Sequence, residues 1–416
     1  MTNSEPISPG RGATAQLITG GFSGGIVSPF PRLRALLEPH QPGAPMIDLG
    51  IGEPKHQMPS FLIDKLVESQ REFGKYPPMR GSEELLAAIA GWIGRRYGIA
   101  GKVDAARHVM VLNGSREGLF SAVFPAVGRK AVTGGRPVVL LPNPFYPPYL
   151  AAALSVGAEP VLLPATAETG DLPDLEALAA RPDVLARTAA FYLCSPSNPQ
   201  GAVASPAYLS QAIGLARRYD FMLFADECYG EVYTREPPTG ALEAAAASAD
   251  GFKNVVAFNS LSKRSNVPGL RSGFIAGDAE FISRLFDFRN ISAAHVPLPV
   301  QHASAALWSE EQHVTQSRLG YIEKFQVADE ILAGRFGYRR PGGGFLLWLD
   351  MTQLGGGEHA AVTLWKRCGV RVVPGAYLAE ENGPRGNPGD AFVRVALVHD
   401  TATTREALER IVSLVR

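Results

Sequence analysis

Cysteine is scarce in this sequence: only Cys194, Cys228 and Cys368 occur in a chain of 416 residues. An odd number at such wide spacing does not make a disulfide framework, and it fits a reducing compartment. Neither sign of charge is in excess, because 40 Lys and Arg balance 40 Asp and Glu. This balance gives no electrostatic footprint for nucleic acid or for an anionic membrane surface. We therefore expect small molecules, and neither nucleic acid nor membrane, as partners.

Long apolar runs are also missing, since none approaches the ~20 residues of a membrane-spanning helix. The opening stretch, MTNSEPISPGRGATAQLITGG, has neither the basic region nor the apolar region of a secretory signal. We therefore expect a cytoplasmic protein. Residues 1–27, which are rich in Gly, Ser, Thr and Pro, are interpreted as a flexible arm. The length allows two or three domains and a sizeable buried core.

Seven short apolar runs dominate the middle of the chain. They are HVMVL (108–112), PVVLL (137–141), PVLL (160–163), AAFYLC (189–194), FMLFA (221–225), VVAFN (255–259) and GFIAG (273–277). Each lacks polar alternation and is followed by a loop or a helical segment. Strands of a parallel sheet have this pattern when helices cover both faces of the sheet. The sequence therefore predicts an α/β fold.

The region beyond residue 300 has a different pattern. A long helix over 301–333, three strands (FLLWLD, VRVVPG and FVRVAL) and a final helix indicate a smaller α+β domain. We divide the chain into the arm 1–27, a segment 28–60 that contributes to the small domain, a large domain 61–300 and a small domain 301–416.

Polar clusters follow five of the apolar runs. They are NGSR (113–116), PNPFYPPY (142–149), SPSNPQG (195–201), DECY (226–229) and SLSKR (260–264). In an open parallel sheet, ligands bind beyond the carboxyl ends of the strands. One such cluster is ordinary loop chemistry, whereas five at one edge predict a binding site.

Part of this site suits an anion. Gly114 and Ser115 begin a helix, where free N–H groups attract negative charge, although plain N-capping explains them as well. Lys263 is a candidate for a Schiff base with a ligand carbonyl, the alternative being a solvated loop lysine. The side chains available for a phosphate group beside it are Ser260, Ser262 and Arg271.

Another part suits a ring. Asp226 ends a buried run, where an unpaired carboxylate is costly unless it caps a turn or meets a cationic ring N–H. Tyr146 and Tyr229 would stack on such a ring or donate to it, but aromatic residues beside proline also serve simple packing.

In this order, IGEP, NGSREGLF, SPSNPQG, DECYG and SLSKRSNVPGLRSGF resemble the fold-type I aminotransferases of class I/II, which depend on pyridoxal 5′-phosphate (PLP). The resemblance covers residues 29–416. It implies a large domain with a seven-stranded, mostly parallel sheet, a smaller α+β domain, transaminase activity on amino and keto acids, and a homodimer with shared active sites.

The resemblance also implies residue roles. Lys263 would bind PLP covalently and move the substrate α-proton, Asp226 would keep the ring nitrogen protonated, and Tyr229 would bind the ring's phenolic oxygen. The implied cofactor-binding residues are Gly114, Ser115, Arg116, Tyr146, Asn198, Asp226, Tyr229, Ser260, Ser262, Lys263 and Arg271, with Tyr76 from the other subunit. The substrate carboxylate would be bound by Gly52, Asn198 and Arg394. No metal ion is expected.

The longer matches, including IGEPKH and PNPFYPPY, look most like bacterial N-succinyldiaminopimelate aminotransferases of lysine biosynthesis. Those enzymes exchange an amine between L-glutamate and a long keto acid that carries a distant carboxylate. The candidates for binding the distant group are Lys55, His56, Arg116, Arg264 and Asn266. Surface ion pairs would explain such residues equally well.

Other interpretations remain open at this point. An aminotransferase for aspartate, aromatic or other amino acids and a PLP lyase share the Lys–Asp core, and Arg394 favours transamination over the lyase. A Rossmann dehydrogenase needs G-x-G-x-x-G between a strand and a helix, and GGG at 342–344 precedes a strand instead. A ligand sensor fused to a DNA-binding module needs a basic domain of about 70 residues ahead of residue 29, by the family's pattern, and a basic patch.

Overall fold

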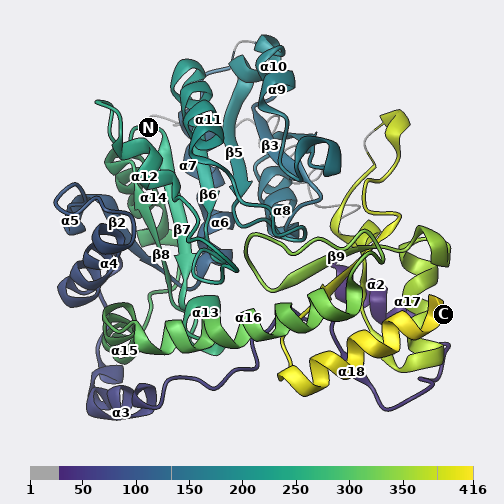
Figure 1. Ribbon diagram of the computed structural model, residues 1–416. Coiled ribbons are helices and arrows are strands. Elements are labelled where there is room, and N and C mark those ends of the chain that lie inside the picture. Colours follow the sequence, from purple (N-terminus) through teal and green to yellow (C-terminus); the bar gives the residue numbers. More distant parts are fainter. Residues whose placement is uncertain (1–27, 133, 382, 416) are drawn as a thin grey trace, which may run out of the picture.

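The computed structural model describes residues 28–132, 134–381 and 383–415, so the arm expected over 1–27 lies outside the described residues. A seven-stranded sheet runs through the larger part of the molecule in the order β2-β8-β7-β6-β5-β3-β4 (Figure 1). Its strands are β2 (Val109–Leu112), β3 (Val138–Asn143), β4 (Glu159–Pro164), β5 (Thr188–Cys194), β6 (Met222–Asp226), β7 (Val255–Ser260) and β8 (Gly273–Gly277). All neighbouring strands are parallel except that β8 is antiparallel to both β2 and β7. The predicted seven-stranded, mostly parallel α/β sheet is confirmed.

Helices cover both faces of this sheet, which is why its strands lack polar alternation. Along β2, Val109 and Val111 join one apolar core, and Met110 and Leu112 join the other. The first core includes α3 (Phe61–Glu68), α4 (Glu83–Arg96), α9 (Leu175–Ala179), α10 (Pro182–Arg187), α11 (Pro206–Tyr219), α12 (Ala241–Ala246) and α15 (Leu298–Ser309). The second includes α6 (Ser115–Ser121), α7 (Val123–Arg129), α8 (Pro147–Ser155) and α14 (Ala279–Ser292). Two four-residue helices, α5 (Ala105–His108) and α13 (Leu261–Arg264), lie at strand ends.

A second, smaller group of elements contains three antiparallel strands in the order β11-β12-β9 and a parallel pair β1-β10. The strands are β1 (Ile47–Asp48), β9 (Leu346–Asp350), β10 (Val370–Arg371), β11 (Val373–Pro374) and β12 (Phe392–Ala396). The helices beside them are α2 (Pro29–Leu37), α17 (Gly357–Cys368) and α18 (Thr401–Val412). The expected strand VRVVPG is therefore divided between two sheets. Ile47 and Leu49 pack in the same apolar core as residues from β9, β12, α17 and α18.

The single helix expected over 301–333 is wrong, because the chain forms two helices, α15 and α16 (Gln312–Leu332). Glu310, between them, accepts the backbone N–H of His313 at 3.1 Å through its carboxylate, and so starts a new helix. Trp308 of α15 lies 4.8 Å from Trp92 of α4 between ring centroids, inside the first core. Residues 301–309, assigned to the small domain, therefore pack with the large sheet.

Helix α16 runs from beside α13 and α15 to α18, along both groups of elements (Figure 1). Its later residues Phe325, Ala328 and Leu332 belong to the core of the smaller group. Within residues 28–132, 134–381 and 383–415, every helix is too short or too polar to cross a bilayer.

Candidate active site

A cavity of about 980 Å³ lies where β5, β6 and β7 end, between the large sheet and the smaller group of elements. Residues that the sequence places far apart line it together: Gly52, Ser115, Arg116, Tyr146, Asn198, Asp226, Tyr229, Lys263, Arg271 and Arg394. Ten of the residues singled out from the sequence thus border one space. Gly114 and Ser262 lie next to lining residues in the chain rather than on the wall, and Ser260 contacts Ser262 through its hydroxyl. Tyr76 is fully exposed elsewhere.

Lys263 lies in α13, immediately after β7, and its Nζ donates a hydrogen bond to the carbonyl oxygen of Gly52. The ammonium lies 5.2 Å from the ring centre of Phe345 and 6.0 Å from that of Tyr229. Burial, together with the positive charge of Arg394, lowers the pKa of Lys263 to about 8. About a tenth of the amine is therefore neutral at pH 7, far more than at the ordinary pKa, and the neutral form is the one that attacks a carbonyl carbon.

Asp226 ends β6 and is 5% exposed. Its carboxylate accepts hydrogen bonds from the Tyr149 hydroxyl at 2.6 Å and from the Cys228 backbone N–H at 3.2 Å. Burial raises the pKa of Asp226, and no Lys, Arg or His of the described chain forms an ion pair with it. A buried carboxylate of this kind is stabilised by a cation brought into the cavity.

Arg394, on β12, is 6% exposed and joins both parts of the wall. It donates from Nη2 to the Gly50 carbonyl oxygen at 2.8 Å and from Nη1 to Asn198 Oδ1 at 3.3 Å. Its Nε is buried and has no partner among the described residues. A guanidinium with an unused donor at a cavity wall suits a carboxylate ligand.

A cluster of polar groups surrounds Arg271, which lines the cavity. Arg271 has a left-handed backbone (φ 54°) and donates to the carbonyl oxygens of Pro268 (2.9 Å) and Asn113 (3.2 Å). Gly114 packs against this guanidinium so closely that a β-carbon there would collide with it. Nearby, Ser260 Oγ and Ser262 Oγ lie 2.9 Å apart at the start of α13. The arrangement concentrates donors where β7 and β2 end.

Arg116 and Tyr146 form another pair on the wall, since Arg116 Nε donates to the Tyr146 hydroxyl at 2.7 Å. Arg116 is exposed, and burial raises the pKa of Tyr146. Tyr229 is buried and packs edge-on against Phe345 at 5.3 Å between ring centroids. The two tyrosines therefore border the same space as Lys263.

Sequence reasoning missed several residues of this wall. Tyr149 contacts Asp226 directly, while Cys194, Cys228 and Glu53 also line the cavity. Tyr149 lies three residues after Tyr146 in the same motif, and a three-residue helical spacing was the only available signal for it.

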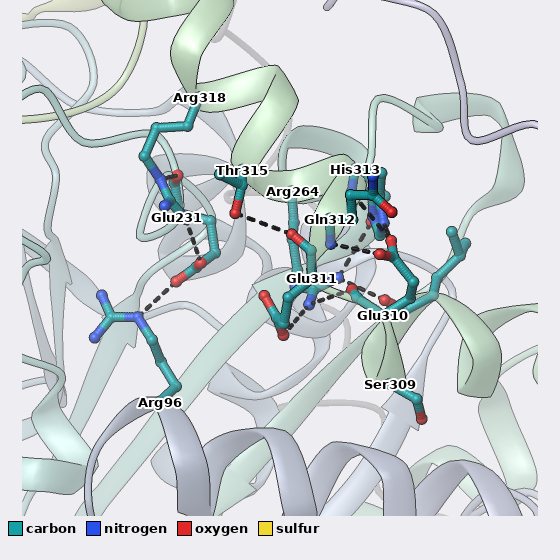
Figure 2. A network of polar contacts seen from close by, with 12 residues as sticks. Arg96, Glu231, Arg264, Ser309, Glu310, Glu311, Gln312, His313, Thr315 and Arg318 are labelled. Atoms are coloured by element: carbon teal, nitrogen blue, oxygen red, sulfur yellow. Dashed lines mark hydrogen bonds and ion pairs between the residues drawn. The ribbon is translucent and has the colours of Figure 1, made fainter.

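Four residues suggested for a distant carboxylate do not line the cavity: Lys55, His56, Arg264 and Asn266. Arg264 is 1% exposed and donates to the Leu307 carbonyl oxygen and to Glu311 Oε1, both at 2.6 Å (Figure 2). Of the five suggested residues, Arg116 alone borders the cavity.

The chain matches the family model for aminotransferase class I and II over residues 44–411. It is 31% identical over 374 residues to the LL-diaminopimelate aminotransferase of Syntrophobacter fumaroxidans, covering 88% of this chain and 91% of that protein. The crystal structure of an aminotransferase from Neisseria meningitidis superposes with a TM-score of 0.88 at 38% identity, covering 97% of this chain and 100% of the other. A probable N-succinyldiaminopimelate aminotransferase from Thermus thermophilus superposes with a TM-score of 0.80 at 27% identity, covering 92% and 99%. The chain therefore belongs to the class I and II aminotransferases, enzymes that depend on pyridoxal 5′-phosphate.

Proposed function

We propose that this aminotransferase moves an amino group between L-glutamate (or 2-oxoglutarate) and N-succinyl-LL-2,6-diaminopimelate (or its keto acid), using PLP held on Lys263. One observation carries the proposal: a buried lysine of lowered pKa, a buried carboxylate without a cationic partner in the described chain, and an arginine with an unused donor line one cavity.

The described residues fit PLP. Asp226 is a buried anion that suits a protonated pyridine nitrogen, and Asn198 and Tyr229 line the same cavity, where they would bind the ring's phenolic oxygen. Tyr146 would stack on the ring. The phosphate would be bound by Gly114, Ser115, Ser260, Ser262 and Arg271, beside the guanidinium against which Gly114 packs. When bound, PLP supplies a ring that withdraws electrons from the substrate α-carbon.

Lys263 has two tasks in this proposal. Its neutral amine would hold PLP covalently through the cofactor's aldehyde carbon, with loss of water. Once released by the substrate, the same amine would accept the proton from the substrate α-carbon and return it. A pKa of about 8 suits both tasks, because an amine of the ordinary pKa would remain protonated near neutral pH.

Arg394 selects the bond that breaks. Held by the Arg394 guanidinium, whose Nε has no partner among the described residues, and with Gly52 close by, the substrate carboxylate would stay in place, so the α-proton rather than the carboxylate is lost. A PLP lyase on the same fold would need a different placement of that carboxylate.

The substrate proposal depends on which residue of the cavity wall would bind the second carboxylate. Two of the relatives reported above are named for diaminopimelate, one for the N-succinylated form and one for the free form. Arg116 is exposed on the cavity wall, and within the described residues its hydrogen-bond partner is the Tyr146 hydroxyl, bound by Nε, so its terminal nitrogens suit a distant carboxylate. Unacylated LL-diaminopimelate is the second candidate.

A cytoplasmic homodimer with shared active sites is also part of the proposal. Tyr76 is fully exposed, and Ile63, Val67, Phe73 and Ile291 are at least 47% exposed apolar side chains. Such side chains suit burial against a second copy of the chain. Tyr76 would then reach the phosphate bound by the partner.

The first test is an absorbance spectrum of the PLP-reconstituted protein, before and after adding L-glutamate. We expect the band of lysine-bound PLP to be replaced by that of pyridoxamine phosphate, and N-succinylated keto acid to reverse the change faster than the unacylated one. Lys263→Ala should lack the lysine-bound band and all turnover, with Lys263→Arg as its charge-matched control. Near-normal turnover by Lys263→Ala would disprove the assignment of Lys263 as the PLP-binding lysine. If only unrelated keto acids reverse the spectral change, the enzyme acts on a substrate other than N-succinyldiaminopimelate.

A further inference from the structure

Three consecutive residues after Lys263 are each tied to helix α16. Arg264 donates to Glu311 Oε1 at 2.6 Å, at the start of that helix (Figure 2). Ser265 Oγ lies 2.8 Å from His313 Nε2, and Asn266 Nδ2 donates to Ser317 Oγ at 3.0 Å. The loop that carries Lys263 is therefore fixed along the first turns of α16.

The segment that follows Gly52 is tied to the same helix. His56 Nδ1 lies 3.2 Å from Ser317 Oγ, and Lys324 Nζ donates to His56 Nε2 at 2.6 Å. Because the ammonium only donates, Nε2 is the accepting nitrogen, and the proton of the neutral ring is on Nδ1, from which it is donated to Ser317. Burial, with the charge of Lys324, lowers the pKa of His56 to about 4, in keeping with a neutral ring.

One face of helix α16 leaves room for the His56 imidazole to pack against it. Ser317, Gly320 and Lys324 lie on one face, three and four residues apart, and a β-carbon at Gly320 would approach His56 Cε1 to 3.1 Å. Tyr321 packs against the ring at 4.3 Å between centroids. A glycine in the middle of a helix is unfavourable by itself, so the room that it leaves for His56 has a structural value.

Two features show that this contact is costly to maintain. Lys324 is 1% exposed, and its hydrogen-bond partners in the described chain are neutral: His56 and, at 3.3 Å, the Leu397 carbonyl oxygen. Asn266 has a left-handed backbone, with φ at 56°, and its side chain is held by Ser317. A buried ammonium and a strained residue both depend on the same few contacts.

We infer that Ser317 is a positioning residue for the reaction, and that it fixes the Lys263 loop against the Gly50–Gly52 segment. Its hydroxyl joins Asn266, three residues after Lys263, to His56, four residues after Gly52. At the other end of these two segments, Lys263 Nζ meets the Gly52 carbonyl and Arg394 meets the Gly50 carbonyl. Ser317 does not line the cavity, so its hydroxyl would act through Asn266 and His56. This inference rests on the proposed role of Lys263 as the PLP-binding lysine.

Ser317→Ala tests the inference in the PLP-loaded enzyme, with Thr315→Ala as the control. Thr315 is exposed on the same helix, and its hydroxyl bonds only to the Glu311 carbonyl within the described chain. We expect Ser317→Ala to raise KM for the amino-acid donor about tenfold while kcat changes much less. The substitution removes the hydrogen bonds of the hydroxyl to Asn266 and His56, which position the cavity wall. The midpoint of the pH titration of the lysine-bound PLP absorbance should also move, and Thr315→Ala should leave both values unchanged.

A second variant separates positioning from loss of stability. Gly320→Ala improves the intrinsic helix propensity of α16 but presses on His56, so KM and the titration midpoint should shift without a large fall in Tm. His56→Leu combined with Ser317→Ala should be little worse than either alone, because both break one chain of contacts. Unchanged KM and midpoint in Ser317→Ala, or shifts that merely follow Tm, would overturn the inference. Failure of the proposed function is seen separately, as a lysine-bound band that survives Lys263→Ala.

Discussion

The Tyr149 hydroxyl donates a hydrogen bond of 2.6 Å to Oδ2 of Asp226, beneath the floor of the cavity. Tyr149 is fully buried and stacks on Tyr192 at 4.5 Å between ring centroids. The hydrogen bond favours the ionised carboxylate, whereas burial favours the protonated one. Asp226 therefore keeps its charge partly because of Tyr149.

Tyr149→Phe should weaken catalysis while leaving the fold intact. Without the hydroxyl, the pKa of Asp226 rises further, and its hold on a protonated ring nitrogen weakens. We expect kcat to fall about tenfold, the cost of one hydrogen bond to a charged group. The acidic limb of the pH–kcat profile should move to higher pH. The matched control is Tyr192→Phe, whose hydroxyl donates to the Leu119 carbonyl at 2.6 Å instead. Equal effects of both substitutions would contradict the prediction.

Arg394→Lys should impair binding of the substrate carboxylate. Lysine keeps the charge but cannot reach Gly50, Asn198 and a ligand at once from a planar fork. We expect KM for the amino acid to rise about a hundredfold, as charge-assisted paired hydrogen bonds are lost, with PLP absorbance unchanged. Arg371→Lys, on β10 and paired with Asp48 at 3.3 Å, is a suitable control. A normal KM in Arg394→Lys would exclude that role.

Tyr76 should act in the partner's active site. Tyr76→Ala and Lys263→Ala homodimers are each expected to be weak or inactive. Mixed dimers contain one site with both residues intact, so mixing and reassociation should restore roughly a quarter of the wild-type sites. The double variant Tyr76→Ala/Lys263→Ala, mixed with Lys263→Ala, provides the control and should remain inactive. Failure of mixing to restore any activity, with subunit exchange verified, would argue against shared sites.

Glu227 should make stability depend on pH in an unusual direction. It is 5% exposed and accepts hydrogen bonds from the Tyr97 hydroxyl (2.7 Å) and the Ala241 N–H (2.6 Å). Burial raises the pKa of Glu227 from 4.5 to about 6, so the folded state binds this proton more tightly than the unfolded state. The stabilisation is present below pH 4.5 and is lost as the pH rises through about 6.

The corresponding experiment compares wild type with Glu227→Gln in denaturant titrations between pH 4.5 and 7. As the pH rises across this range, wild type should lose about 2 kcal/mol of its free energy of unfolding relative to Glu227→Gln. Glu231→Gln is the control, because Glu231 is similarly buried but is paired with Arg96 and Arg318 (Figure 2). A pH-independent difference for Glu227→Gln would show that its pKa is not raised.

The strands of the large sheet were predictable because burial on both faces requires a continuous apolar run. Such a run is visible in the sequence without knowing which strands lie beside it. The direction of β8 was not predictable, since GFIAG looks the same whether its neighbours run with it or against it. The break before α16 was also missed, because Glu310 fits a helix as well as it caps one.

In the site, Asp226 and Lys263 could be found because each directly follows a strand, and strand ends meet at one edge. Arg264 could not be placed in the same way. It follows Lys263 in the sequence, but on the short helix α13 the two side chains leave in different directions, and Arg264 reaches α15 and α16 instead. Tyr149 and Ser317 contact residues that are distant in the sequence, and the residues next to them in the chain give no indication of those contacts.

The pairing of β1 with β10 has a consequence for synthesis. Ile47 meets Val370, and Asp48 meets Arg371 across a separation of 323 residues. On the ribosome, the seven-stranded sheet has all its strands once Gly277 has emerged, whereas β1 has no partner strand until Arg371 has emerged. Arg394 emerges later still. A nascent chain can thus complete the sheet that carries Lys263 long before it acquires the arginine proposed to bind substrate, so the ability to hold the cofactor should arise before the ability to choose what reacts with it.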